Sequence, residues 1–472
     1  MNQFRGTITR TGLRSVVLIS ILVAGLGTAL AQVAFDAPDA DYTGRARASS
    51  AERGKLVLAG GEVQVSGQDF KPGQEITISR GISVIGSPVV ADAEGKFEVK
   101  FTLPADAVVG THQLVVTTAK PYHAETIDLK ISPVVPLSGA DKFSAETAKL
   151  VPGLYQSAYS ARNNVLFVTA ATGRPPVKSS ALVKVNPETL AIEAQVTPGA
   201  APAREGAENN DGGVFAVYGV GVDDANDTVW VTNTRQNTVA AYKQSDLSLL
   251  KQFDPGTVQH ARDVAVDEKD GKVFASATGT PNVAVFDAKS LEFVQNIEIK
   301  STKRGEDFSV GSLRFDPTSG KLYTVSLTTS EAAIIDVATL AVDKVFPVEG
   351  ARTAIGVSYD AQTNRIFVAG QGSDNLLIVD AESGKTLHNV AVGAGALNVA
   401  FDPVKRLAYV TSRDAGTITV VDVDGNIVAN LENAPFSNHV SVDGKGNAFA
   451  VNKARNPEDE QGDRITRLSP KS

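Results

Sequence analysis

The feature that most constrains the fold is a strand-like segment that recurs seven times from about residue 153 onward. Each copy carries one aromatic residue in the same frame, as in VLFVTA, TVWVTN and LAYVTS. Self-similarity at a period of about 40–50 residues indicates a repeat architecture. The seven aromatic residues, separated by 63, 44, 49, 44, 42 and 40 positions, are Phe167, Trp230, Phe274, Tyr323, Phe367, Tyr409 and Phe449.

Each repeat contains several short strands and no helical period. An apolar-x-apolar-Asp segment precedes six of the aromatic residues, and a third and a fourth strand follow. Four strands per repeat are typical of a β-propeller blade, so the sequence predicts seven blades. We expect each aromatic residue to fill the space between adjacent blades rather than to contact a ligand. The aspartates that end the first strands are Asp223, Asp267, Asp316, Asp360, Asp402 and Asp443.

The last repeat is incomplete, because only three strands fit between residue 440 and the end of the chain. A propeller ring must close or leave a sheet edge exposed. We therefore expect the segment TAKLV at 147–151 to supply the fourth strand. Residues 136–152 then form a linker and the ring-closing strand, and residues 153–472 form the propeller.

The amino terminus has the pattern of a secretory signal peptide. Arg5, Arg10 and Arg14 precede an apolar run at 16–30, and the small-x-small sequence at 29–31 predicts cleavage before Gln32. We expect a periplasmic or secreted protein with no membrane span after cleavage of residues 1–31. An uncleaved anchor is the alternative, and the apolar run is short for one.

Two further segments precede the propeller. Residues 32–53 are rich in Ala, Asp, Arg and Ser and are interpreted as a flexible linker. Residues 54–135 alternate apolar and polar positions between turns, which predicts a small β-sandwich. The patterns V-x-V-x-G-x-x-F-x-P-G and G-x-F-x-V-x-F-x-L-P resemble bacterial immunoglobulin-like modules, which usually act as spacers or adhesive units. The predicted fold class is thus all-β, a seven-bladed propeller behind a small immunoglobulin-like sandwich.

The composition excludes or disfavours several kinds of chemistry and binding. The chain has no cysteine, which excludes disulfides and thiolate chemistry, and its net charge of −8 argues against indiscriminate binding of nucleic acid. The glycines at 393–395 open no helix, and no phosphate-binding or nucleophile-elbow motif occurs. We therefore expect no cofactor and identify no catalytic residue.

Several segments resemble the YncE-type periplasmic propellers with YVTN repeats. They are VWVTNTRQNTVAAY at 229–242, the run at 153–185, TSRDAGTITVVD at 411–422 and the charged stretch near the carboxy terminus. The resemblance covers about residues 145–472. It implies an exported, non-enzymatic propeller linked to DNA binding, while the sandwich departs from the single-domain form of that family.

Basic residues of the loops predict an anion site at one face of the propeller. Loops between the second and third strands, and between blades, should share the face with the channel mouth. These loops carry mainly Arg, whose planar donor fork suits phosphate or carboxylate, and nearby acids could instead pair with it. The candidates are Arg262, Arg304, Arg352 and Arg413, which lie nearest to strand starts, together with Arg235 and Arg174.

The sequence is compatible with three functions. The first is a monomeric binding scaffold for nucleic acid, another anionic polymer or a protein partner. The second is a metal-dependent hydrolase of the lactonase or lyase kind, with oxygen and imidazole ligands at the channel mouth. The third is a purely structural role in the cell envelope. The candidate metal ligands are Asp263, Asn398, Asn438 and His439.

Overall fold

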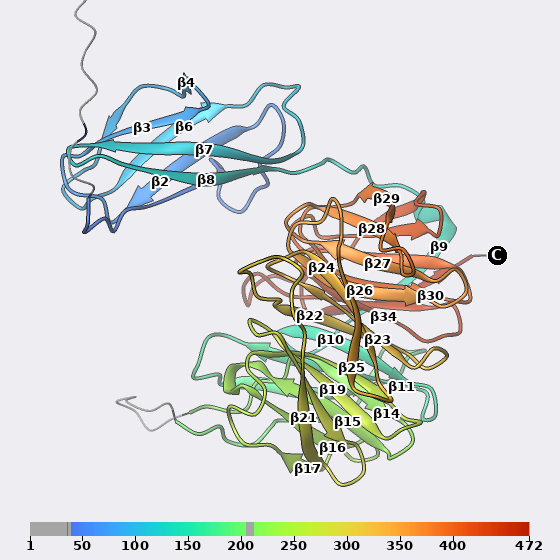
Figure 1. Ribbon diagram of the computed structural model, residues 1–472. Helices are drawn as coiled ribbons and strands as arrows, with labels where there is room; N and C mark the ends of the chain where they lie inside the picture. Colours follow the sequence, from blue (N-terminus) through green and yellow to red (C-terminus); the bar gives the residue numbers. More distant parts are fainter. Residues whose placement is uncertain (1–34, 36–38, 204–211, 472) are drawn as a thin grey trace, which may run out of the picture.

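The computed structural model describes residue 35 and residues 39–203 and 212–471. The predicted signal peptide, residues 1–31, lies outside the described residues. Figure 1 shows a small β-sandwich, coloured blue to cyan, joined by a linker to a larger ring of sheets that runs from green to red. Among the described residues, no helix is both long enough and apolar enough to cross a membrane.

The sandwich consists of two antiparallel sheets, β1-β2-β6 and β4-β3-β7-β8, with β5 beside β3. Alternate residues of its strands face a shared core, in which Val63, Val65 and Ile76 are completely buried. This is the period-2 pattern seen in the sequence. The immunoglobulin-like character of the sandwich stays a prediction. The strands are β1 (Arg45–Ser50), β2 (Glu62–Gln68), β3 (Glu75–Arg80), β4 (Ser83–Val84), β5 (Val89–Val90), β6 (Phe97–Thr102), β7 (Gly110–Ala119) and β8 (His123–Ile131).

One segment differs from its prediction. Residues 45–50 were assigned to the flexible linker at 32–53, but they form β1, which pairs with β2 along its whole length. The polar composition hid a short alternation in which Ala46 and Ala48 pack against the sandwich core. The paired backbone and this half-buried face hold the segment in the sheet.

The ring contains seven four-stranded antiparallel sheets within the described residues, which confirms the predicted propeller. Blades 1 to 3 consist of the following strands: in blade 1, β10 (Leu154–Ser160), β11 (Val165–Thr172), β12 (Ser179–Val185) and β13 (Ile192–Val196); in blade 2, β14 (Val220–Asp223), β15 (Thr228–Asn233), β16 (Thr238–Lys243) and β17 (Leu249–Gln252); in blade 3, β18 (Ala261–Asp267), β19 (Lys272–Ala277), β20 (Asn282–Asp287) and β21 (Glu292–Glu298). Blades 4 to 6 consist, in blade 4, of β22 (Val310–Asp316), β23 (Lys321–Ser326), β24 (Glu331–Asp336) and β25 (Ala341–Pro347); in blade 5, of β26 (Ala354–Asp360), β27 (Arg365–Gly370), β28 (Asn375–Asp380) and β29 (Thr386–Ala391); and in blade 6, of β30 (Ala396–Asp402), β31 (Leu407–Ser412), β32 (Thr417–Asp422) and β33 (Ile427–Glu432). Blade 7 consists of β34 (Ser437–Val442), β35 (Ala448–Asn452), β36 (Arg464–Pro470) and β9 (Phe143–Lys149).

The recurrent aromatic residues pack between blades, as expected. All seven lie on the second strand of a blade and are at most 3% exposed. Trp230 of blade 2 contacts the core of blade 3, Phe274 contacts blade 4, and Phe449 of the last blade contacts blade 1. The same packing therefore repeats around the whole ring and joins its end to its beginning.

The ring closes through the segment that precedes the first blade. Strand β9 pairs antiparallel with β36 from Phe143 to Lys149 and completes the last sheet. The pairing begins four residues before the TAKLV segment, and Thr147 lies opposite Thr466. Closure removes an exposed sheet edge that an incomplete seventh blade would leave.

The aspartates that end the first strands organise the following turns. Asp267 Oδ1 accepts hydrogen bonds from the backbone N–H groups of Lys269 and Asp270. Asp360 accepts equivalent bonds from Gln362 and Thr363. Such turns satisfy backbone donors and hold the register between the first and second strands. Their repetition leaves the other ends of the first strands, at the opposite face, free to present side chains to the central channel.

Candidate functional site

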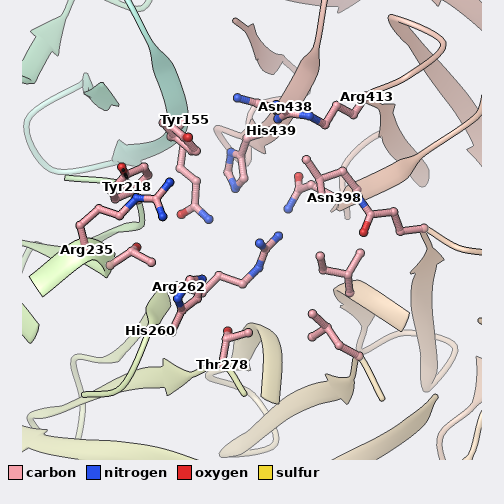
Figure 2. Close-up of a pocket in the computed structure, with 16 residues that line it drawn as sticks. Tyr155, Tyr218, Arg235, His260, Arg262, Thr278, Asn398, Arg413, Asn438 and His439 are labelled. Atoms are coloured by element: carbon pink, nitrogen blue, oxygen red, sulfur yellow. Dashed lines mark hydrogen bonds between the residues drawn. The ribbon is translucent and has the colours of Figure 1, made fainter. Parts of the chain in front are cut away.

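A cavity of about 370 Å³ lies at one mouth of the central channel. All seven blades contribute to its wall, either at the start of a first strand or in the loop between the second and third strands. Figure 2 shows side chains from different blades pointing toward one open space. The propeller thus brings together residues that are far apart in the chain, on the face that the sequence predicted.

Arg262 is the central cation of this cavity. It belongs to β18, the innermost strand of blade 3, and its guanidinium points toward the open space (Figure 2). Its Nε is buried and has no hydrogen-bond partner among the described residues. Burial lowers the pKa of the guanidinium, and the nearby positive charge of Arg413 lowers it further, although the Asp263 carboxylate opposes the shift. Arg262 is therefore a partly buried cation with no hydrogen-bonded counterion among the described residues.

Arg413 approaches from the opposite side of the channel. It lies in the loop after β31 of blade 6, and its Nη1 donates to Asn438 Oδ1. The guanidinium also lies over the ring of Phe436, 4.7 Å from the centroid. These two contacts fix the side chain at the cavity wall. They leave other donors of the guanidinium for a ligand.

Arg235 and two tyrosines form the wall at blades 1 and 2. Arg235 lies in the short turn η2 (Thr234–Gln236), and its Nε donates to the hydroxyl of Tyr218 at 3.2 Å. Tyr155 and Tyr218 pack edge to face, with ring centroids 4.3 Å apart. Burial raises the pKa of both hydroxyls, so they remain neutral near pH 7.

Lys453 adds a fourth cation behind this wall. Its Nζ lies 4.1 Å from the centroid of the Tyr155 ring and donates to the carbonyl of Ala171 at 3.1 Å. Burial lowers the pKa of its ammonium to about 8, and the charges of Arg413 and Arg235 act in the same direction. The mouth is thus strongly electropositive despite the acidic net charge of the chain.

The described part of the cavity wall carries basic but no acidic side chains. No Asp or Glu is among the described residues that line it. Within the same part of the chain, Arg235, Arg262 and Arg413 form no direct ion pair with a carboxylate. Among the residues that the structure describes, the nearby acids therefore form no ion pair with these three arginines.

The candidate metal ligands instead connect neighbouring blades. Asp263 Oδ2 accepts from the backbone N–H of Leu313, and Asn398 Oδ1 accepts from that of Val440. Each bond joins the first strands of consecutive blades. The described residues contain no group of three or more histidine or acidic side chains arranged to hold a metal ion.

Asn438 and His439 are engaged in similar links. Asn438 accepts from Arg413 and donates to the carbonyl of Leu154 at 2.8 Å. His439 Nδ1 accepts from the backbone N–H of Ser157 at 3.4 Å, and burial, aided by the charge of Arg262, lowers its pKa to about 3. These four side chains support the first strands around the channel.

The chain is similar in sequence to bacterial proteins named YncE. The chain is 24% identical over 334 residues to the protein YncE of Salmonella typhimurium, which covers 67% of this chain and 88% of that protein. The YncE protein of Escherichia coli K12 is 24% identical over 263 residues, covering 53% and 68% of the two chains. This likeness and the ring of four-stranded sheets fit a YncE-type propeller. No family model matches the chain.

A solved structure supports the fold alone. Hydrazine synthase of Kuenenia stuttgartiensis superposes with a TM-score of 0.55 at 13% identity, over 69% of this chain and 97% of that chain. At this identity the likeness concerns only the arrangement of strands. It therefore adds nothing about what the YncE-type propeller binds.

The structure separates the predicted arginines into two groups. Arg235, Arg262 and Arg413 line the cavity. Arg304 and Arg174 lie in exposed loops and are not among the residues of its wall. Arg352 forms an ion pair with Asp128 of the sandwich, so its guanidinium is already engaged by a carboxylate.

Sequence reasoning missed the apolar part of the wall. Leu327, Ile355 and Leu397 line the cavity from blades 4, 5 and 6 of the YncE-type propeller. Each occupies a position equivalent to that of a polar mouth residue in another blade. The repeat alignment could have located them, but a search for charged groups passes over aliphatic residues.

Proposed function

We propose that this protein is an exported, non-enzymatic binding protein whose channel mouth holds an anion. The observation that carries the proposal is the Arg262 guanidinium, which faces the cavity with its buried Nε unpaired. Removing a cation from water is costly unless a partner compensates for the lost hydration. A bound anion would supply that partner.

The surrounding groups favour an oxyanion. Arg235 and Arg413 extend donors toward the same space, and no acidic side chain of the described wall competes with a ligand. Guanidinium groups form paired hydrogen bonds to carboxylate or phosphate oxygens. Three such groups around one small cavity therefore select for a negatively charged ligand.

Nucleic acid is a more specific candidate, which rests on the family resemblance. The cavity of about 370 Å³ has room for a small ligand or the end of a flexible strand. A rigid duplex would have to lie across the mouth. We therefore include DNA in the experiment as a separate ligand class.

The first experiment measures anion binding by calorimetry on the protein without residues 1–31. Sulfate and phosphate are titrated at constant ionic strength, with chloride as the reference. We expect saturable binding that is reduced at least about tenfold in Arg262→Gln and in Arg413→Gln. Arg162→Gln is the matched control, because Arg162 is exposed and donates to the Asp224 carbonyl of another turn. Absence of saturable binding in the unsubstituted protein would overturn the proposal.

The second experiment titrates single-stranded and duplex DNA over a salt series. The variants are the double substitution Arg262→Ala/Arg413→Ala and, separately, Arg304→Ala/Arg352→Ala. Salt-sensitive binding that only the first pair abolishes would extend the ligand class to nucleic acid at this mouth. Loss in the second pair alone would locate DNA outside the cavity. Absence of binding at low salt would restrict the site to small anions.

A further inference from the structure

The cavity wall is divided by polarity. The cations Arg235 and Arg262 come from blades 2 and 3, and Arg413 comes from blade 6. The aliphatic residues Leu327, Ile355 and Leu397 come from the consecutive blades 4, 5 and 6. Three of the seven blades therefore present an aliphatic side chain to the same small space that Arg262 enters.

We propose that the ligand is a small organic anion with an apolar body. Its carboxylate or phosphate group would bind Arg262, with Arg413 and Arg235 as further donors. Its apolar body would lie against Leu327, Ile355 and Leu397. This inference rests on the proposed anion site and names the class of ligand that the site takes.

The size and wall of the cavity support this class over a bare oxyanion. A volume of about 370 Å³ lies within the range of about 300–1,000 Å³ that is typical of small-molecule sites. Such sites combine an apolar lining with a few polar groups that fix orientation. A bare sulfate or phosphate would accept hydrogen bonds from the guanidinium groups. It would leave Leu327, Ile355 and Leu397, which we call the aliphatic sector, in contact with water.

The aliphatic sector is also open to a ligand rather than sealed in the core. Leu327 lies in the loop between β23 and β24 and is only partly buried, and Leu397 on β30 is likewise partly exposed. Ile355 is 4% exposed and also lines the cavity. Covering partly exposed leucine side chains with an apolar group is favourable, because it removes apolar surface from water.

The test compares phenyl phosphate with inorganic phosphate and with the uncharged phenyl glucoside. Calorimetry on the protein without residues 1–31 should show phenyl phosphate binding about tenfold more tightly than inorganic phosphate. Phenyl glucoside should bind at least about tenfold more weakly than phenyl phosphate, because it lacks the anionic group. Equal affinities for the two phosphates would overturn this inference while leaving the anion site intact. Failure of both phosphates to bind would overturn the anion site itself.

Substitutions test whether the aliphatic sector causes the preference for phenyl phosphate over inorganic phosphate. Leu327→Ser should reduce the ratio of the two phosphate affinities to near one, because it weakens the binding of phenyl phosphate. Leu397→Ser is a second variant with the same expectation, in case the first one perturbs its loop. Leu249→Ser is the matched control, because Leu249 lies on the outer strand β17 and is 50% exposed. An unchanged ratio in both folded variants would refute the assignment.

Discussion

The Lys130 ammonium of the sandwich lies 2.6 Å from Asp374 Oδ1 of the propeller, and the Asp374 side chain is only 2% exposed. Lys130 also donates to the carbonyl of Gln371, a residue whose side chain lines the channel-mouth cavity. A second ion pair joins Asp128 to Arg352 nearby. The sandwich therefore contacts the propeller beside the candidate site through residues of one strand, β8.

Breaking the Lys130–Asp374 pair should loosen this contact. Lys130→Met removes a donor from a nearly buried carboxylate, which costs about 1–3 kcal/mol. We expect a larger radius of gyration in small-angle X-ray scattering, because the sandwich would no longer be held beside the propeller. Lys100→Met is the control, since Lys100 pairs with Glu98 within β6 and both side chains are about half exposed. An unchanged scattering profile in Lys130→Met would contradict this account.

Replacing Arg262 should stabilise the protein while abolishing anion binding. Arg262→Met removes a partly buried cation whose Nε has no hydrogen-bond partner among the described residues. In buffer without multivalent anions, we expect the free energy of unfolding to rise by about 1 kcal/mol. Urea denaturation followed by Trp230 fluorescence measures the change.

Arg406→Met provides the contrasting case. Arg406 forms two hydrogen bonds to the Asp360 carboxylate, whose side chain is 2% exposed. Its loss should lower the free energy of unfolding by about 2 kcal/mol, because the buried carboxylate loses its partner. If both substitutions destabilised the protein equally, Arg262 would have to be paired in solution.

The stability of the protein should depend on pH through His439. Burial keeps the folded imidazole neutral down to a pKa of about 3, whereas the unfolded one has its ordinary pKa near 6.5. The unfolded chain therefore takes up a proton first, and stability falls as the pH drops from about 6.5 toward 3.

The variant His439→Asn should lose less stability over this interval. We expect the difference in the free energy of unfolding between pH 7 and pH 4 to be about 1–3 kcal/mol smaller than in the unsubstituted protein. Urea denaturation at both pH values measures it, and contributions from the carboxyl groups cancel in the comparison. Identical pH profiles for the two proteins would show that His439 titrates normally.

Anion affinity should fall at alkaline pH through Lys453. Its pKa of about 8 means that the ammonium loses its proton between pH 7 and pH 9, and one positive charge then leaves the mouth. Sulfate is the suitable probe, because its own charge is constant over this range. We expect binding to weaken about threefold or more, and to be uniformly weak in Lys453→Met.

A matched variant tests whether the pH dependence is local to the mouth. Lys289 is exposed in the turn after β20, outside the loops that form the cavity. Lys289→Met should keep both the affinity and its decline above pH 8. A decline of the same size in Lys453→Met would assign the effect to another group.

Much of the fold could be predicted because its signals are local. Trp230 and Phe449 recur at blade spacing, and both lie between blades in the structure. The shortage of one strand at the carboxy terminus required a partner from elsewhere, and β9 supplies it. By contrast, β1 escaped prediction because Ala46 and Ala48 give only a weak apolar alternation.

The candidate site was only partly predictable, because the effect of each arginine depends on its surroundings. The repeat pattern assigns Arg262, Arg352 and Arg413 alike to the loops and strand starts at the channel mouth. In the structure, Arg352 forms an ion pair with Asp128, which lies 224 residues away in the chain, while the Arg262 Nε has no hydrogen-bond partner among the described residues. No local pattern encodes that difference.

The sequence by itself determined the seven-bladed ring and the face on which its loops gather, since strand alternation, turns and aromatic spacing act over a few residues and repeat. Only the tertiary structure decided which loop cations stay unpaired and where aliphatic residues join them in one cavity. Desolvation and ion pairing depend on distances through space, and in a closed ring those distances connect residues from every blade.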